Sequence, residues 1–549
     1  MPHAVPSLTF AGLLASAAPA LAQGPLPPPT FPPQNPITAE KAVLGKALFW
    51  DEQLSSDNSV ACGTCHIPAA GGSDPRLDLA NRHPGLDGVY GNEDDRFASA
   101  GVVRAGADGA LKEDALFGFE RQVTGRHSPS MIGASLFDEL FWDGRASGTF
   151  VDPESGATSI PTGGALESQS LGPILSFVEM ADEGRTWDDV KTKLARVQPL
   201  ALASDITPDL AAALSADPTY PDLFDNAFGD PTITAERIAY ALATYQRTLH
   251  PDQTPWDLFQ QGVPGAMTGA QIQGFNTFMN PGLQCRTCHP PPAFTDGSFR
   301  NLGLRDIAED NGRQAVTGLF SDRGKFKVPS LRNVGLRSRF FHNGDPTWQS
   351  LFLAIFIYNQ GVGFFPENND PALSGIFMAP ATASTILNFL STALDDPRVA
   401  NELPPFDRPT LASERGTAAT LVGAARAGSG GFEPRIVAVS PAYVGAGEFR
   451  VAMHSGLGGA DAVLVATTAN GPGLGSIAGG ATLARPASRI LARASLAGVG
   501  AGAGTATWRG QLPADPAFSG TTLDLRWLVR DPGAASSVAA TETARMIVW

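Results

Sequence analysis

Apolar residues recur at helical spacing in three parts of the chain. Between 234 and 249 they stand at Ile238, Leu242, Tyr245 and Leu249, and the segment 43–48 shows the same spacing. Thr268 precedes Gln271 by three residues, which is the pattern of a helix-capping box. Because a period of 3.6 residues places such side chains on one face, we predict helices over 43–48 and 234–249 and from 268 onward.

The pattern changes after Asp407. Short apolar or alternating runs stand at 435–439, 462–465 and 523–529, and Gly-rich turns separate them. A two-residue period bounded by turn residues is typical of β-strands. We therefore expect a small all-β sandwich over 434–549, preceded by a Gly- and Ala-rich linker over 411–433.

Length and charge narrow the class of protein. The chain has 549 residues, of which 43% are hydrophobic, and this is too long for one compact core. Its net charge of -15 contains no long run of one sign, which argues against nucleic acid and anionic membranes as partners. After the first 22 residues, no stretch reaches the roughly 18 uninterrupted apolar residues of a membrane span, so we expect none.

The N-terminus resembles a cleaved secretory signal. An apolar stretch from Leu8 to Ala18 is followed by the small-residue site Ala20-Leu21-Ala22, although no Lys or Arg precedes Leu8. We predict a signal peptide over 1–22 and a Pro-rich leader over 23–40. The mature protein is then expected in the periplasm or otherwise secreted.

The four cysteines form two Cys-x-x-Cys-His motifs, at 62–66 and 285–289. Two thiols on one helical turn can bond both vinyl groups of one haem, and the adjacent imidazole can reach the iron. Zinc would need four ligands per site, and thioredoxin-like chemistry does not require the histidine. We therefore predict two covalently bound haem c groups. The attachment residues are Cys62, Cys65, Cys285 and Cys288, and the iron ligands are His66 and His289.

Further short segments accompany the two motifs. They are Leu44–Phe49, Phe141–Ala146, Glu167–Gln169, Gly172–Pro173, Glu179–Met180, Val328–Val334 and Phe341–Gly344. In order and placement they resemble the bacterial diheme cytochrome c peroxidase family, with its methylamine-utilisation relative MauG, over about residues 41–400. The resemblance implies a mainly α fold with two cytochrome c-like haem domains. We place the peroxidatic domain at 41–262 and the electron-transfer domain at 263–410.

The resemblance also implies roles for three side chains. Trp142, in its Trp-Asp-Gly-Arg context, is expected between the two haems, and Gln169 and Glu179 are expected on the peroxide side of the first haem. A carboxylate can relay the proton that peroxide loses from one oxygen and gains on the other, while an amide can orient it. The alternatives are core packing for Trp142 and a solvated carboxylate for Glu179.

The sixth ligand of the second haem separates the relatives, because the peroxidases use a methionine and MauG a tyrosine. Alignment on Leu351 places Tyr358 at that position, so we predict Tyr358 as an iron ligand. A phenolate would lower the potential of this haem. The alternatives are that Tyr358 is a buried helix residue or that Met378 is the ligand.

Two departures from the family concern calcium, which the resemblance implies between the haem domains. His127 stands where an asparagine is usual and Arg337 where a threonine is usual. Since calcium prefers oxygen ligands, these side chains disfavour calcium as a third cofactor. Residues 147–165 look like an inserted loop, and His83 is an alternative distal ligand of the first haem.

The expected function is that of an oxidoreductase of the cytochrome c peroxidase type. It would reduce hydrogen peroxide to water with electrons from a small donor protein, of the cytochrome c or cupredoxin type, through the second haem. Two alternatives stay open. One is a MauG-like diheme oxidase that uses peroxide to oxidise a larger substrate, and the other is a non-enzymatic periplasmic electron carrier.

Overall fold

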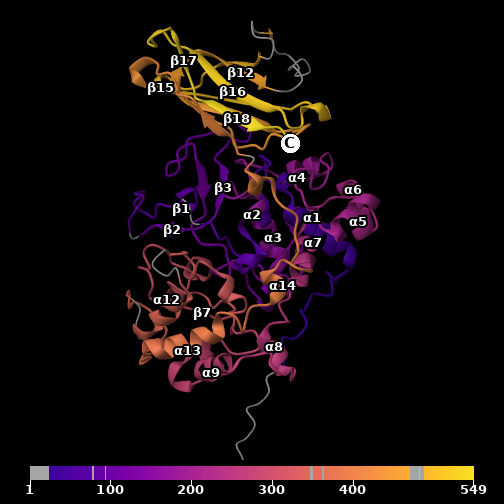
Figure 1. The fold of residues 1–549 in the computed structure, drawn as a ribbon, viewed down its shortest axis with the longest axis vertical. Helices are drawn as coiled ribbons and strands as arrows, with labels where there is room; N and C mark the ends of the chain where they lie inside the picture. Colours follow the sequence, from indigo (N-terminus) through magenta and orange to yellow (C-terminus); the bar gives the residue numbers. More distant parts are fainter. Residues whose placement is uncertain are drawn as a thin grey trace, which may run out of the picture.

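The computed structural model describes residues 24–76, 79–92, 94–345, 350–360, 364–416, 418–469, 481–482 and 488–549 (Figure 1). The predicted signal peptide, 1–22, lies outside these residues. About 30% of the chain is helical, and several small sheets accompany the helices. Across the described ranges, the search for a helix long and apolar enough to cross a membrane found none.

Helices predominate up to residue 400, and the strands among them are short. The helices are α1 (Ala39–Trp50), α2 (Cys62–Cys65), α3 (Ala165–Leu175), α4 (Trp187–Leu194), α5 (Pro208–Ala216), α6 (Tyr220–Phe228), α7 (Ala235–Thr248), α8 (Pro255–Gln260), α9 (Gly269–Phe278), α10 (Cys285–Cys288), α11 (Gln314–Thr317), α12 (Leu351–Phe356), α13 (Pro380–Leu390) and α14 (Pro397–Ala400). The strands are β1 (Arg82–His83), β2 (Arg96–Phe97), β3 (Ala100–Val103), β4 (Arg121–Val123), β5 (Phe150–Val151), β6 (Thr158–Ile160), β7 (Phe299–Arg300) and β8 (Phe326–Lys327). The hairpin β5–β6 lies in the segment predicted as an inserted loop.

The three predicted helices are confirmed as α1, α7 and α9. Side chains of Thr38, Thr234 and Thr268 accept a backbone hydrogen bond at each N-terminus, and Thr268 forms the predicted capping box with Gln271. Helices α1 and α7 pack so closely at Gly45 that a Cβ atom there would lie 2.0 Å from the Ala241 carbonyl oxygen. Only glycine permits this approach.

Two apolar clusters fill the helical part. The first lies among α1, α3 and α7, and the second lies between α9 and α13. Trp256 on α8 belongs to the second cluster, whereas Val399 and Phe406 pack into the first. The clusters therefore cross the predicted boundary at 262, and the assignment of haem domains stays a prediction.

A repeat of local structure relates the two helical regions, α1–α7 and α8–α13. The Lys327 amide donates to the Trp142 carbonyl (2.8 Å), and the His127 amide donates to the His342 carbonyl (2.8 Å). The numbers of the two donors, and of the two acceptors, differ by 200. The same spacing relates left-handed residues nearby: Gly133 and Asn333, Phe141 and Phe341, and Gly144 and Gly344. The two regions therefore meet through equivalent, reciprocal contacts.

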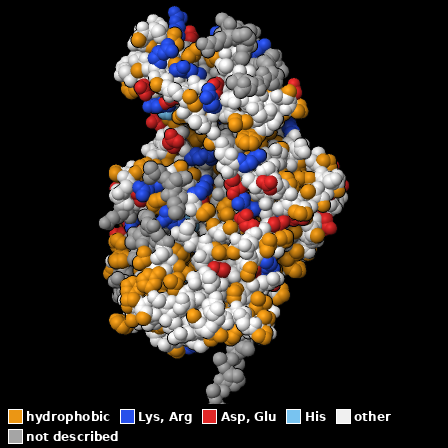
Figure 2. Space-filling view, viewed as in Figure 1, with side chains coloured by type: hydrophobic (Ala, Val, Ile, Leu, Met, Phe, Trp, Pro, Cys, Tyr) orange, Lys and Arg blue, Asp and Glu red, His pale blue; other side chains and the backbone are white. Residues whose placement is uncertain are grey.

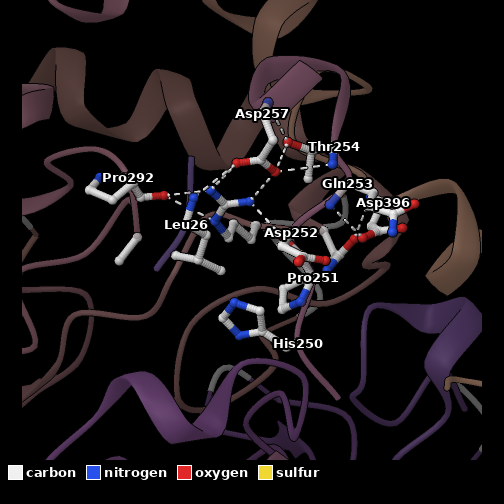
Figure 3. A network of polar contacts seen from close by, with 12 residues as sticks. Leu26, His250, Pro251, Asp252, Gln253, Thr254, Asp257, Pro292 and Asp396 are labelled. Carbon is white, nitrogen blue, oxygen red and sulfur yellow. Dashed lines mark hydrogen bonds and ion pairs between the residues drawn. The ribbon is translucent and has the colours of Figure 1, made fainter. Parts of the chain in front are cut away.

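A buried ion pair holds the connection between the two regions (Figure 3). Arg332 donates to both carboxylate oxygens of Asp257 at 2.7 and 2.8 Å, and their side chains are 1% and 0% exposed. The same guanidinium donates to the carbonyls of Pro251 and Pro292. The amide of Leu26, from the Pro-rich leader, also donates to Asp257. One ion pair thus joins the leader, the connection and the second region.

The chain ends in strands, which lie at the top of Figure 1 and are called here the β unit. They are β9 (Thr420–Val422), β10 (Arg435–Val437), β11 (Phe449–Gly458), β12 (Asp461–Ala469), β13 (Ala481–Thr482), β14 (Ser488–Ser495), β15 (Gly500–Gly510), β16 (Thr522–Arg530), β17 (Val538–Ala540) and β18 (Thr543–Ile547). The strands predicted at 435–439, 462–465 and 523–529 are confirmed as β10, β12 and β16.

Two antiparallel sheets make up the β unit. One has the order β10-β11-β15, and the other β13-β14-β12-β16-β18-β9, with β17 beside β16. Val451 from the first sheet and Leu464 and Trp527 from the second belong to one apolar cluster. Strand β9 lies within the range predicted as a linker. The sequence did not predict this strand, because β9 is formed by pairing with the distant β18 and the local pattern does not show that pairing.

The Arg332–Asp257 pair yields a prediction about stability. Replacement of Arg332 by Met leaves the Asp257 carboxylate buried without its cation, which costs about 3–5 kcal/mol of unfolding free energy. The control is Arg323→Met, because Arg323 pairs with the exposed Glu367 and such pairs contribute about 0–1 kcal/mol. Denaturant titration of the haem-loaded full chain measures both. Equal losses in the two variants would contradict the anchoring role of Arg332.

Candidate functional site

One cavity of about 720 Å³ extends between the two helical regions. Every residue predicted for the site lines it. These residues are Cys62, Cys65, His66, Trp142, Gln169, Glu179, Cys285, Cys288, His289 and Tyr358. The structure therefore brings the residues together, while their chemical roles stay predictions.

The cysteines of each motif lie on a one-turn helix, α2 or α10, and all four are free of disulfides. At α2 the fit is tight, since a Cβ at Gly63 would lie 2.2 Å from the Trp50 ring. Burial raises the pKa of Cys62 to about 12 and that of Cys65 to about 11. The two cysteines and the following histidine of each motif thus lie within about one helical turn of one another, as attachment of a single haem requires.

The two motif histidines have the same environment. The Nδ1 atom of His66 lies 3.0 Å from the Gly72 carbonyl oxygen, and that of His289 lies 2.9 Å from the Phe294 carbonyl oxygen. A carbonyl can only accept, so Nδ1 carries the proton and the lone pair of Nε2 is left for a ligand. Burial lowers the pKa of both imidazoles, which favours the neutral form that binds iron.

Buried nitrogens in the cavity wall support a cofactor with acidic groups. Both ring nitrogens of His127, Nε of Arg337, and Nε and Nη1 of Arg339 have no hydrogen-bond partner within the described ranges. Buried donors are nearly always paired, so such a group indicates a missing anionic partner. The propionates of haem are anionic, and the cavity residues therefore fit two haem groups.

The same residues do not fit calcium. Burial, together with the charges of Arg337 and Arg339, lowers the pKa of His127 to about 4, with Asp74 opposing. Two guanidinium groups beside an imidazole repel a cation, and among the described residues no group of three His, Cys, Asp or Glu is placed to hold a metal ion.

Gln169 lies on α3, which a buried ion pair holds in place. Arg247 on α7 donates to both oxygens of Glu167, at 2.7 and 2.9 Å, two residues before Gln169. Asn35, from the Pro-rich leader, donates to the same carboxylate at 2.8 Å. Since both side chains of the ion pair are almost fully buried, α3 has little freedom to rotate.

Glu179 follows the end of α3, in a turn begun by Ser176. The amide of Glu179 donates to the Ser176 carbonyl at 3.1 Å. Burial raises the pKa of Glu179, against a hydrogen bond with Ser176 and the charge of Arg145. The negative charge of Glu179 also contributes to the raised pKa of Cys62 and of Cys65. The Glu179 carboxylate therefore lies close to the first motif. A raised pKa makes this carboxyl easier to protonate than an ordinary glutamate, which suits a group that accepts and returns a proton.

Trp142 is buried in the cavity wall and its indole Nε1 donates to the His127 carbonyl at 2.8 Å. His127 in turn donates its amide to His342 of the other region. The ring of Trp142 is therefore held at the junction of the two regions, and its place between two haems stays a prediction.

Both Tyr358 and its rival Met378 line the cavity. Burial and the neighbouring Cys288 and Cys285 raise the pKa of Tyr358, which places this phenol near the second motif. Met378 is 1% exposed. The choice between the two ligands is not decided by their placement.

His83 lies outside the cavity wall. Its Nδ1 accepts a hydrogen bond from the Gly85 amide at 3.1 Å, and its ring contacts Phe117 edge-on. A loop hydrogen bond therefore occupies the side chain that was considered as a distal ligand.

Two further cavity residues were not found from the sequence. Arg126 joins Asp143, next to Trp142, to Asp310 of the second region at 2.6 and 2.7 Å. The buried His342 stacks on Phe326, with ring centroids 3.6 Å apart. The repeat of 200 residues could have indicated His342 as the equivalent of Trp142, whereas no local signal indicates the Arg126 bridge.

Comparison with known proteins identifies a family. The sequence model of the di-haem cytochrome c peroxidases matches residues 39–264. MauG of Methylorubrum extorquens is 30% identical over 318 residues, which cover 57% of this chain and 67% of that protein. MauG of Methylophilus methylotrophus is 27% identical over 315 residues, covering 57% and 71%. Cytochrome c peroxidase Ccp of Escherichia coli is 29% identical over 348 residues, covering 62% and 58%.

The matches include the first haem motif, the reciprocal contacts join it to the second, and one cavity contains both. The chain belongs to the diheme cytochrome c peroxidase family, a family of oxidoreductases.

Proposed function

We propose that the protein reduces hydrogen peroxide to water at the first haem site, using electrons that a small donor protein delivers to the second. The observation that carries this proposal is the single cavity, in which Glu179 lies beside the first Cys-x-x-Cys-His helix. Each haem, when bound, supplies a redox-active iron. The net reaction consumes one peroxide, two electrons and two protons and forms two water molecules.

Glu179 and Gln169 supply the proton chemistry in this proposal. The Glu179 carboxylate accepts the proton from one peroxide oxygen and returns it to the oxygen that leaves as water. The Gln169 amide, held on the fixed α3, orients the peroxide by hydrogen bonding. Trp142 lies in the wall between the two haem sites and is proposed to connect them for electron transfer.

The exposure of the two motif helices supports the direction of electron flow. On α2 the residues between the cysteines, Gly63 and Thr64, are buried, whereas Arg286 and Thr287 on α10 are exposed. A donor protein can therefore approach α10 but not α2. Figure 2 shows hydrophobic side chains gathered over the α12–α13 part of the molecule. Phe377, which stands between these two helices in the sequence, is 81% exposed. Such a patch suits a transient cytochrome c or cupredoxin partner.

Tyr358 favours a second candidate function. If its phenolate binds the second iron, this haem has a low potential and the protein resembles MauG in its chemistry. The protein would then use peroxide to oxidise a larger substrate. The periplasmic or secreted location belongs to the proposal too, since the predicted signal lies outside the described residues.

The optical spectrum of the purified all-ferric protein, with haem content counted, tests the function. Under the peroxidase proposal, one equivalent of peroxide changes the spectrum of the first haem once the second is reduced. A rapid change without prior reduction would favour the MauG-like alternative. If two haems are attached but neither the all-ferric nor the half-reduced protein responds to peroxide, both the peroxidase and the MauG-like proposals are overturned. The electron-carrier alternative then stands.

Glu179→Gln tests the proton relay. We expect the rate constant of the peroxide reaction to fall on the order of a hundredfold with both haems attached, because an amide cannot accept the proton. The control is Glu183→Gln, since Glu183 pairs with Arg104 and Lys112 away from the cavity. A wild-type rate in Glu179→Gln would remove this residue from the mechanism.

The pH dependence follows from the raised pKa of Glu179. The reactive form is the carboxylate, so the rate is complete above this pKa and is lost as the pH falls through it. Because burial raises the pKa, the loss occurs at a higher pH than for an ordinary glutamate near 4.5. A rate profile measured with constant haem content should show this step, and Glu179→Gln should lack it.

Tyr358→Phe tests the ligand of the second haem. Loss of an anionic ligand raises the reduction potential of that haem and changes its spectrum, while the first haem keeps its own. Met378→Leu removes the rival sulfur with little change in volume and should leave both properties unaltered. The opposite pattern would identify Met378 as the ligand and favour the reductively activated peroxidases.

A further inference from the structure

The β unit packs against the region that carries the first motif. Val103 and Ala105, in and after β3, share a small apolar cluster with Ala452 on β11. The ring of Phe119 also stacks on His454 of β11, with centroids 4.4 Å apart. Figure 2 shows charged side chains of both signs along the same boundary. The contact is therefore partly apolar and partly ionic, unlike that of a module on a free tether.

The central polar contact of this boundary is Arg450 on β11 with Asp182. The two guanidinium nitrogens Nη1 and Nη2 donate to the two carboxylate oxygens at 2.7 and 2.6 Å. The side chains are 3% and 12% exposed. Nη2 also lies 3.4 Å from the Ser56 carbonyl oxygen. One side chain of the β unit thus holds two loops of the helical region.

Both loops belong to the surroundings of the first haem site. Asp182 stands three residues after Glu179, and Ser56 stands six residues before Cys62. The Ser56 amide donates to the Met180 carbonyl at 2.8 Å, and the Asp182 amide donates to Ser56 Oγ at 2.9 Å. Arg450 therefore closes a small network that includes the residue next to Glu179.

The Glu179 turn contacts the Arg450 network on one side and strand β3 on the other. The Val102 amide donates to the Val178 carbonyl at 3.2 Å, and a Cβ at Gly101 would lie 2.7 Å from the Cα atom of Glu179. Strand β3 thus separates the turn from the apolar part of the boundary. The turn is held by β3 on one side and by the network of Arg450 on the other.

We propose that Arg450 is a positioning residue for the peroxide reaction, through which the β unit keeps the Glu179 carboxyl in the cavity wall. The inference rests on the proposed function, since it assigns Arg450 a role through Glu179. A bidentate pair between two nearly buried side chains is suited to this task, because its geometry allows few alternatives. A displacement of about 1 Å at a reacting group is enough to slow a reaction considerably.

The test compares three variants of the full haem-loaded chain. In Arg450→Gln and in Asp182→Asn we expect the peroxide rate constant to fall about tenfold, with two attached haems and an unchanged spectrum of the second haem. Arg450→Lys keeps the charge but loses the forked geometry and should recover part of the rate. The control is Arg509→Gln, which removes an ion pair to Glu448 and a hydrogen bond to the Asp108 carbonyl on the same boundary. It should retain the wild-type rate.

A double-variant cycle separates positioning from general destabilisation. If Arg450 acts through Glu179, adding Arg450→Gln to Glu179→Gln lowers the rate no further. Additive losses, or equal losses in Arg450→Gln and Arg509→Gln, would overturn the inference. A wild type that does not react with peroxide overturns the proposed function instead, and a reactive wild type with an unaffected Arg450→Gln overturns the positioning role alone.

Discussion

Two histidines from distant parts of the chain must face one cavity, and the other features of the structure follow from this requirement. His66 and His289 each lie at the end of a one-turn helix, and a single helical turn is not stable alone. The surrounding chain therefore has to hold them. Among the contacts that join the two regions are reciprocal backbone hydrogen bonds of Trp142 and His342. Backbone groups have no rotamers, so these contacts keep the two sites in register.

Buried charge completes this framework. The pairs of Arg332 with Asp257 and of Arg247 with Glu167 are almost fully buried, and each joins segments that are distant in sequence. Such pairs contribute more to a defined geometry than to net stability, because desolvation offsets most of their attraction. In the cavity wall, nitrogens of His127, Arg337 and Arg339 have no hydrogen-bond partner among the described residues. Since they line the cavity, they indicate the acidic groups of a cofactor.

The β unit enters the same framework from outside. None of its side chains lines the cavity among the described residues, and its contact with the Glu179 turn runs through one guanidinium and two loops. A domain without reactive groups can still define a site when it limits the conformations of the loops around it. The proposed proton relay of Glu179 and the position of the β unit are thereby linked through a short, almost buried network.

The sequence by itself determined the haem motifs, the capped helices and the strands β10, β12 and β16, because their signals are local in spacing and chemistry. It also identified Trp142, Gln169, Glu179 and Tyr358, which the structure places in one cavity. Only the tertiary structure decided that both motifs share this cavity, that Phe406 packs into the first cluster and that β9 lies in the predicted linker. The Arg450 contact is likewise visible only there. Such pairings depend on which surfaces from distant parts of the chain pack together, and the local spacing of hydrophobic and polar residues does not specify this.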